Sequence, residues 1–181
     1  MSKTLNLLLF FFVIASCNNS SSRLFNSLDF KKTNIKFSNI LIENDSINIL
    51  NYEYFYNGAG VALADVNNDG LLDIFFTGNQ VDNELYINKG NLIFENISND
   101  AKISKPNPSI WSSGVSIIDI NNDDLLDIYI SNTLRKDKKL RKNLLYINQG
   151  INNDKIPVFK EMSSEYNLSD DSYSSSSHFF D

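Results

Sequence analysis

The 181-residue chain has very few of the side chains that form disulfides, zinc sites and nucleophilic active sites. It contains one cysteine, Cys17, and one histidine, His178. A single cysteine cannot form an internal disulfide, so we expect stability to come from packing or from a bound metal ion. With so few thiol and imidazole groups we expect neither a zinc site nor a nucleophilic triad, although carboxylate chemistry stays open.

Long apolar runs are also scarce, and the one clear example lies near the N-terminus. It extends almost unbroken from Leu5 to Ile14 and follows the positive charge of Lys3. The run is too short to cross a bilayer as a stable helix. Its position and flanking residues are typical of a signal peptide, which we predict over residues 1–16.

Cys17 directly follows Ile14, Ala15 and Ser16, and this pattern resembles the lipobox of bacterial lipoproteins. There the cysteine is lipidated and becomes the new N-terminus. We therefore predict that residues 17–23 form a lipidated N-terminus and a polar, flexible tether. The protein is expected in the bacterial cell envelope, with the membrane as a partner through the lipid anchor. The alternative is an ordinary signal peptide followed by a free thiol.

Positive charge is in deficit. There are 16 lysines and arginines against 22 aspartates and glutamates, which gives a net charge of −6. An acidic chain is poorly suited to bind nucleic acid or anionic lipid without specific contacts, so we expect no nucleic-acid partner. A divalent cation suits this composition better.

The chain contains two copies of one block. GVALADVNNDGLLDIFFTG, residues 60–78, matches GVSIIDINNDDLLDIYISN, residues 114–132, at 10 of 19 positions. A second block follows each copy, LYINKG from Leu85 and LYINQG from Leu145, and a phenylalanine-led stretch completes each repeat. This preserved order predicts a repeat protein.

Each repeat is predicted to form four short strands, because apolar runs alternate with turn clusters of Asn, Asp and Gly. In the first copy the predicted strands are Val61–Ala64, Ile74–Thr77, Leu85–Asn88 and Phe94–Ser98. Equivalent positions lie 54 residues apart, which suits one four-stranded blade with its connections. The predicted fold is therefore all-β, a β-propeller, in which radial repetition protects the sheet edges.

The repeats also suggest boundaries within the chain. We predict an N-terminal segment over residues 24–58, repeats over 59–112 and 113–173, and the start of a third repeat at 174–181. Phe25–Asp29 is similar to the stretch from Phe94 and is predicted to be the outer strand that closes the ring. Two blades and a fraction cannot close a ring, so we expect this chain to be an N-terminal piece of a longer protein.

The first repeat carries a nonapeptide, DVNNDGLLD, with oxygen-bearing groups at positions 1, 3, 5, 7 and 9. The predicted metal ligands are the side chains of Asp65, Asn67, Asp69 and Asp73 and the backbone carbonyl of Leu71. Calcium takes about six to eight oxygen ligands, so waters would complete the shell. Gly70 would supply the sharp turn that lets the chain wrap the ion.

The second repeat carries the same pattern with one exception. Its predicted ligands are the side chains of Asp119, Asn121, Asp123 and Asp127 and the backbone carbonyl of Leu125. Asp124 stands where the first loop has Gly70. Aspartate adopts a left-handed conformation less readily than glycine, so we expect this second site to be weaker or strained.

Two other structures have Asp-rich loops of similar sequence. An EF-hand needs an acidic residue at position 12, where this chain has Phe76 and Ile130, and its flanks would be helices rather than strands. A pair of Asx-rich hairpin turns without metal is the remaining alternative. Two copies in register favour a metal-binding loop.

The Asp-x-Asn-x-Asp-Gly-x-x-Asp loop between two strands resembles the FG-GAP and VCBS repeats of integrin α-subunit propellers. The longer run from Tyr56 to Asn79, followed by ELYINKG and FENIS, is similar to bacterial ASPIC/UnbV-type proteins and to cartilage acidic protein. This resemblance implies an exported, calcium-binding, seven-bladed propeller, and it supplies no catalytic residues. Asp124 departs from the family pattern.

These observations predict a calcium-binding module that acts in adhesion, binding or scaffolding and is not an enzyme. Its partner would be a protein or a glycan. One alternative is the propeller part of an extracytoplasmic carbohydrate-active enzyme whose catalytic residues lie beyond residue 181. RNA binding, a label carried by some members of the resembled group, is a second alternative that the acidic composition argues against.

Two further features have predicted structural roles. The basic stretch from Arg135 to Lys142 is a loop insertion in the second repeat, and we expect it to be solvated. The aromatic residues at blade-packing positions are expected in the core rather than on a stacking surface, namely Trp111, Tyr129, Phe75 and Phe76.

Overall fold

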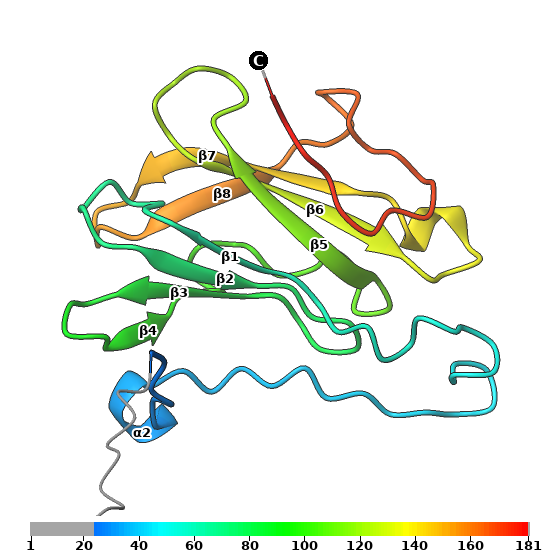
Figure 1. Ribbon diagram of the computed structural model, residues 1–181. Coiled ribbons are helices and arrows are strands. Elements are labelled where there is room, and N and C mark those ends of the chain that lie inside the picture. The colour runs from blue at the N-terminus through cyan, green and yellow to red at the C-terminus, as the bar shows by residue number, and fades with distance from the viewer. Residues whose placement is uncertain (1–23, 181) are drawn as a thin grey trace, which may run out of the picture.

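The computed structural model describes residues 24–180. The predicted signal peptide, Cys17 and the whole predicted tether, residues 17–23, lie outside these residues. The regular secondary structure is almost entirely β, arranged as two four-stranded antiparallel sheets (Figure 1). This confirms the predicted all-β fold class. Among the residues described, no helix has the length and apolar character needed to span a membrane.

The first sheet is formed by the first repeat, with its strands in sequence order. The strands are β1 (Val61–Ala64), β2 (Asp73–Phe76), β3 (Glu84–Asn88) and β4 (Phe94–Asn96). Each overlaps a strand predicted from the sequence. Neighbouring strands pair in antiparallel register, with Leu63 opposite Ile74 and Ile74 opposite Tyr86, so these three side chains share one face of the sheet.

The second sheet repeats this order with longer strands. They are β5 (Trp111–Ile118), β6 (Asp127–Thr133), β7 (Leu144–Ile151) and β8 (Pro157–Glu161), with a short 3-10 helix η1 (Lys138–Leu140) between β6 and β7. β5 begins at Trp111, two residues before the predicted repeat boundary at 113. Its pairing with β6 shifts register between Ser112 and Val115, which is a bulge in β5. β1 and β5, the first strands of the two sheets, are the inner strands.

The two sheets pack face to face around the main core. The first sheet contributes Phe75, Leu85 and Ile87, and the second contributes Ile128 and Ile130. All five side chains are at most 5% exposed, as expected where two sheets interdigitate. Three of the four aromatic residues predicted as core are buried, namely Trp111, Tyr129 and Phe75.

The outer face of the first sheet is covered only in part, by an extended N-terminal segment at residues 34–42. This segment follows the one-turn helix α2 (Phe30–Thr33). The ring of Phe37 stacks on Phe76, the fourth predicted core aromatic, at a centroid distance of 4.7 Å. Leu63 on the same face stays 61% exposed.

The outer face of the second sheet is covered by the chain that follows β8. Tyr129, Leu145 and Ile147 form a second core cluster on this face, and partly buried hydrophobic residues pack against them: Ile120, Met162, Tyr166, Leu168 and Phe179. The ring of Phe179 meets Tyr129 edge-on at 5.3 Å. The second sheet is therefore packed on both faces.

The inner strands of successive repeats approach closely. A Cβ atom at Gly60 would lie 2.7 Å from the Ser113 carbonyl oxygen, and one at Gly114 would lie 2.5 Å from the Ser175 carbonyl oxygen. Residues 174–180 form no strand, yet they pass beside β5 as β5 passes beside β1 (Figure 1). Small residues at these two positions are what allow the close approach.

The predicted ring-closing strand, Phe25–Asp29, is not a strand in the described structure. Phe25 is 88% exposed, and Asp29 caps α2 by accepting a hydrogen bond from the Lys31 N–H at 2.9 Å. None of the described strands pairs with this segment. A role for this segment in closing a ring stays a prediction.

Candidate metal centre

The first Asp-rich loop, residues 65–73, connects β1 to β2 and curls around the carboxylate of its first aspartate. The two Asp65 oxygens accept the N–H of Asp69 at 3.0 Å and of Gly70 at 2.7 Å. Asn68 and Gly70 both have left-handed backbone, with φ of 57° and 85°. These hydrogen bonds and turns wrap the loop backbone around the Asp65 carboxylate.

The second loop, residues 119–127, has the same geometry. The Asp119 carboxylate accepts the N–H of Asp123 at 3.1 Å and of Asp124 at 2.9 Å. Asp124 adopts φ of 65°, the conformation that Gly70 adopts in the first loop. Asp124 therefore takes the left-handed backbone of the glycine that it replaces, at a cost of roughly 1 kcal/mol relative to glycine. A weaker second site stays a prediction.

The ninth residue of each loop is a buried aspartate that ties the loop to the third strand. Asp73 accepts the N–H of Val66 at 3.0 Å and of Asn88 at 2.8 Å. Burial raises the pKa of the Asp73 carboxyl to about 6, and the nearby negative charges of Asp69 and Asp65 add to this rise. A buried carboxylate surrounded by like charges is a group that a cation would stabilise.

Asp127 has the same place in the second loop. It accepts the N–H of Ile120 at 3.1 Å and of Asn148 at 2.8 Å. Burial also raises the pKa of the Asp127 carboxyl above its ordinary value. The two loops therefore present the same arrangement of charge in different repeats.

Sequence reasoning missed the asparagine that braces each loop from the third strand. The Asn88 side chain donates to the Leu72 carbonyl at 3.0 Å, and the Asn148 side chain donates to the Leu126 carbonyl at 3.3 Å. Both asparagines end an LYIN block, so their repetition was the available signal. They hold the backbone immediately before the buried aspartate.

The two loops are also in contact with each other. The Asn68 side chain donates to the Asp124 carbonyl at 3.2 Å, and the buried Asn148 side chain donates to the Val66 carbonyl at 3.0 Å. The two sets of predicted ligands are thus neighbours on one edge of the molecule. A conformational change in one loop would therefore act on the other through these hydrogen bonds.

The fit of these loops to calcium is partial. Each supplies three carboxylates and an amide oxygen, which is a donor set for a hard cation. Within residues 24–180, however, no three acidic, histidine or cysteine side chains already converge as a metal-binding group. The Asp65 and Asp119 carboxylates instead accept backbone N–H groups. Ion binding would need side-chain adjustment, and calcium stays a proposal.

A buried lysine was not anticipated from the sequence. The Lys105 ammonium donates to the carbonyls of Gly78 at 2.5 Å, Val81 at 2.7 Å and Ile110 at 2.9 Å. Burial lowers the pKa of Lys105 to about 8. This side chain ties the loop after β2 to the connection before β5. Its role is structural, because its donors are directed at backbone carbonyls.

The basic insertion lies between β6 and β7, as predicted, but it is not fully solvated. Arg141 is only 9% exposed, and its guanidinium donates to the carbonyls of Arg135 at 2.9 Å and Lys136 at 3.1 Å. It also lies 4.2 Å from the centre of the Tyr173 ring. The expectation of a solvated loop is therefore wrong for Arg141, which fastens the loop to the chain after β8.

The two stacked four-stranded antiparallel sheets, each with an Asp-rich loop between its first two strands, are two copies of a β-propeller-like repeat. Residues 65–130 match the family model described as an FG-GAP-like repeat. The match includes both Asp-rich loops and supports the FG-GAP and VCBS resemblance. No curated protein matches the chain in sequence. The finer resemblance to ASPIC/UnbV-type proteins stays a prediction.

Proposed function

We propose that the protein is an exported, lipid-anchored module of β-propeller repeats that binds calcium and acts in binding, adhesion or scaffolding. The observation that carries this proposal is the repeated loop geometry. Asp65 and Asp119 organise their loops through equivalent hydrogen bonds, and Asn68 joins the two loops. The same geometry in both copies supports a shared role for the two loops.

Calcium is the cation that suits these loops. Their carboxylates and amide oxygens are hard ligands, and the raised pKa of Asp73 reflects charge that the loop alone stabilises poorly. Metal bound only by the folded state adds to stability. Calcium would therefore stiffen the edge of the blades where the loops lie.

Binding is favoured over catalysis by what the buried ionisable groups do. Asp73, Asp127 and Lys105 are each engaged with backbone groups, and His178 is exposed in the segment after β8. A carbohydrate-active enzyme with catalytic residues beyond residue 181 is the second candidate. A cluster of acidic residues in sequence beyond residue 181 would favour this enzyme.

The lipid anchor rests on the apolar run before Cys17. In cells, the Cys17→Ser variant should move from the membrane fraction to the soluble fraction, and mass spectrometry should find an acylated cysteine at the mature N-terminus of the original protein. A mature form that begins at another residue would remove the lipoprotein part of the proposal.

Calcium binding is tested by melting the full-length protein with millimolar calcium and with chelator. At affinities typical of extracellular modules, roughly 10⁻⁴ to 10⁻³ M, each site would add on the order of 1 kcal/mol. Asp69→Ala should remove the shift at the first loop, and Asp123→Ala should remove less if Asp124 has weakened the second.

Asp154→Ala is the matched control, because this exposed aspartate lies in the turn between β7 and β8, outside both loops. It should leave the calcium-dependent shift unchanged. If calorimetry detects no bound calcium and melting is the same with chelator, the loops are metal-free Asx turns and the calcium proposal is wrong.

A further inference from the structure

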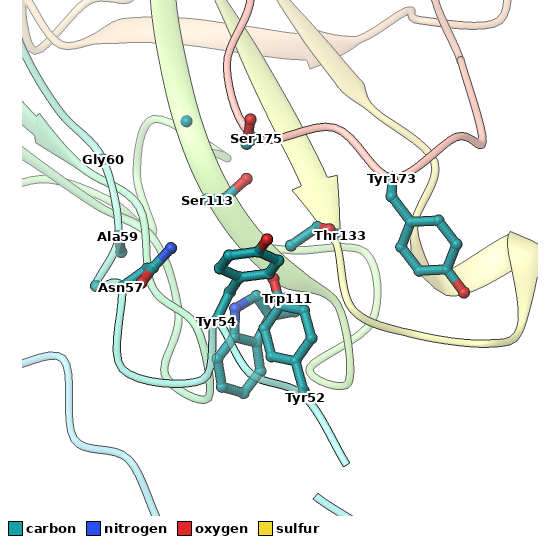
Figure 2. Close-up of a pocket in the computed structure, with 12 residues that line it drawn as sticks. Tyr52, Tyr54, Asn57, Ala59, Gly60, Trp111, Ser113, Thr133, Tyr173 and Ser175 are labelled. Carbon is teal, nitrogen blue, oxygen red and sulfur yellow. The ribbon is translucent and has the colours of Figure 1, made fainter. Parts of the chain in front are cut away.

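A cavity of about 680 Å³ opens where the inner strands begin, whereas the Asp-rich loops follow the ends of these strands. Figure 2 shows the residues around it, which come from the connection before β1, from β5 and β6, and from the segment after β8. Because β1 and β5 run from the cavity toward the loops, the cavity and the candidate calcium sites lie at opposite ends of the inner strands.

The cavity is formed from equivalent positions of successive repeats. Asn57 and Trp111 each lie eight residues before the first aspartate of their Asp-rich loop, and Tyr173 has the same spacing before Asp181. Three copies of one position therefore meet at one site. Part of the cavity wall therefore follows from the repeat architecture, whereas Tyr52 and Tyr54 come from the connection before β1.

Aromatic rings form much of the wall. The Tyr52 ring meets the buried Trp111 ring edge-on at 6.2 Å and the Tyr54 ring at 5.8 Å. In Figure 2 these three rings form one group, and Tyr173 lies apart from them beyond Thr133. Tyr54 is 54% and Tyr173 61% exposed, so both side chains keep area that a ligand can contact, although the Arg141 guanidinium covers one face of the Tyr173 ring.

The remaining lining groups are small and polar but uncharged. Side-chain hydroxyls and an amide come from Ser113, Thr133, Ser175 and Asn57, and three glycines leave backbone groups accessible. The lining includes no aspartate, glutamate, lysine, arginine or histidine. The lining side chains therefore carry no charge to neutralise an anion, and they are too polar for a purely apolar ligand.

We propose that this cavity binds a neutral carbohydrate. Exposed tyrosine rings can pack against the C–H faces of a sugar ring, and the hydroxyl and amide groups can exchange hydrogen bonds with sugar hydroxyls. The inference rests on the proposed function, because it names the ligand class of the binding module. The ligand would be held at the opposite end of the inner strands from calcium, without contacting the ion.

The test uses the full-length protein in millimolar calcium and titration calorimetry with cello-, xylo-, manno- and malto-oligosaccharides. At least one of these neutral sugars should bind. Tyr54→Ala and Tyr173→Ala should each weaken that binding at least tenfold. Tyr56→Ala is the matched control, because this ring is 63% exposed but does not line the cavity, and it should bind like the original protein.

An oligogalacturonate serves as the charged comparison. The proposal is overturned if none of the neutral sugars binds, if only the oligogalacturonate binds, or if the tyrosine variants bind as the original does. Melting of the same samples with calcium and with chelator separates the two proposals. A retained calcium shift without sugar binding would reject the carbohydrate ligand and leave the calcium-stabilised module standing.

Discussion

The two sheets have the same strand order and similar side chains, yet their surroundings differ. The second sheet packs against the first on one face and is covered by the chain after β8 on the other. The first sheet has only residues 34–42 on its outer face, where Leu63 remains exposed. The comparison shows that a blade depends on its neighbours for burial, which is the rule for repeat proteins.

The two Asp-rich loops differ in sequence at a key position but share one conformation, whereas the two sheets are similar in sequence but differ in burial. Their sequences differ at the sixth position, where Gly70 is replaced by Asp124, but both residues adopt left-handed backbone. The hydrogen bonds around them are retained, so the loop conformation is fixed by the aspartates and not by glycine. The difference between the loops is thus expected in free energy and not in shape.

The largest expected effect tests the difference in burial between the sheets. Ile128 and Ile74 are equivalent positions, but Ile128 is completely buried and Ile74 only partly. Ile128→Ala should lower the free energy of unfolding by about 2–5 kcal/mol. Ile74→Ala should cost clearly less. Urea unfolding of the full-length protein measures both, and equal losses would mean that the two faces are equally covered.

An intermediate effect concerns pH in the presence of chelator. The pKa of Asp73 is about 6 in the folded protein against an ordinary 3.8, so the folded state keeps a proton that the unfolded chain has lost between these values. The stabilisation is complete below pH 4 and is lost as the pH rises to about 6. Asp73→Asn should flatten this part of the stability curve.

The exposed Asp100 supplies the control for the pH experiment. Asp100→Asn should keep the slope of the original protein between pH 4 and 6. Calcium should reduce the slope, because it binds the ionised carboxylate. A slope that is the same in Asp73→Asn and in the original protein would show that this carboxyl is not its source.

The smallest expected effect sharpens the comparison between the loops. Asp124→Gly should raise the free energy of unfolding by roughly 1 kcal/mol, because it removes the cost of left-handed backbone. Gly70→Asp should lower it by a similar amount. Thermal melting in chelator detects both changes. If Asp124→Gly destabilises the protein, then the aspartate side chain contributes more than its backbone costs.

The strands and the Asp-rich loops could be predicted from the sequence because their signals are local. Alternating apolar residues and turn residues specify β1 to β4 without knowledge of the partners. The early start of β5 at Trp111 could not be predicted, since it depends on the bulge between Ser112 and Val115. Lys105 was also missed, because its acceptors are carbonyls of distant loops.

The cavity was missed for a related reason. Tyr52 and Tyr54 lie in a long connection that has no counterpart in the second repeat, so comparison of the repeats could not identify them. Trp111 was correctly placed in the core, but its position next to an open cavity depends on how three segments meet. Contacts between repeats, unlike strands, are not encoded in either repeat alone.

The close approach at Gly60 and Gly114 makes the contact between repeats directional. Each repeat offers a glycine that receives the next repeat's carbonyl, and the second also offers the Ser113 carbonyl that enters the first. The glycine side and the carbonyl side of this contact are different surfaces, and the second repeat carries both of them. A duplicated repeat would therefore dock onto its parent without a compensating substitution, which makes this a heterologous interface suited to growth by gene duplication.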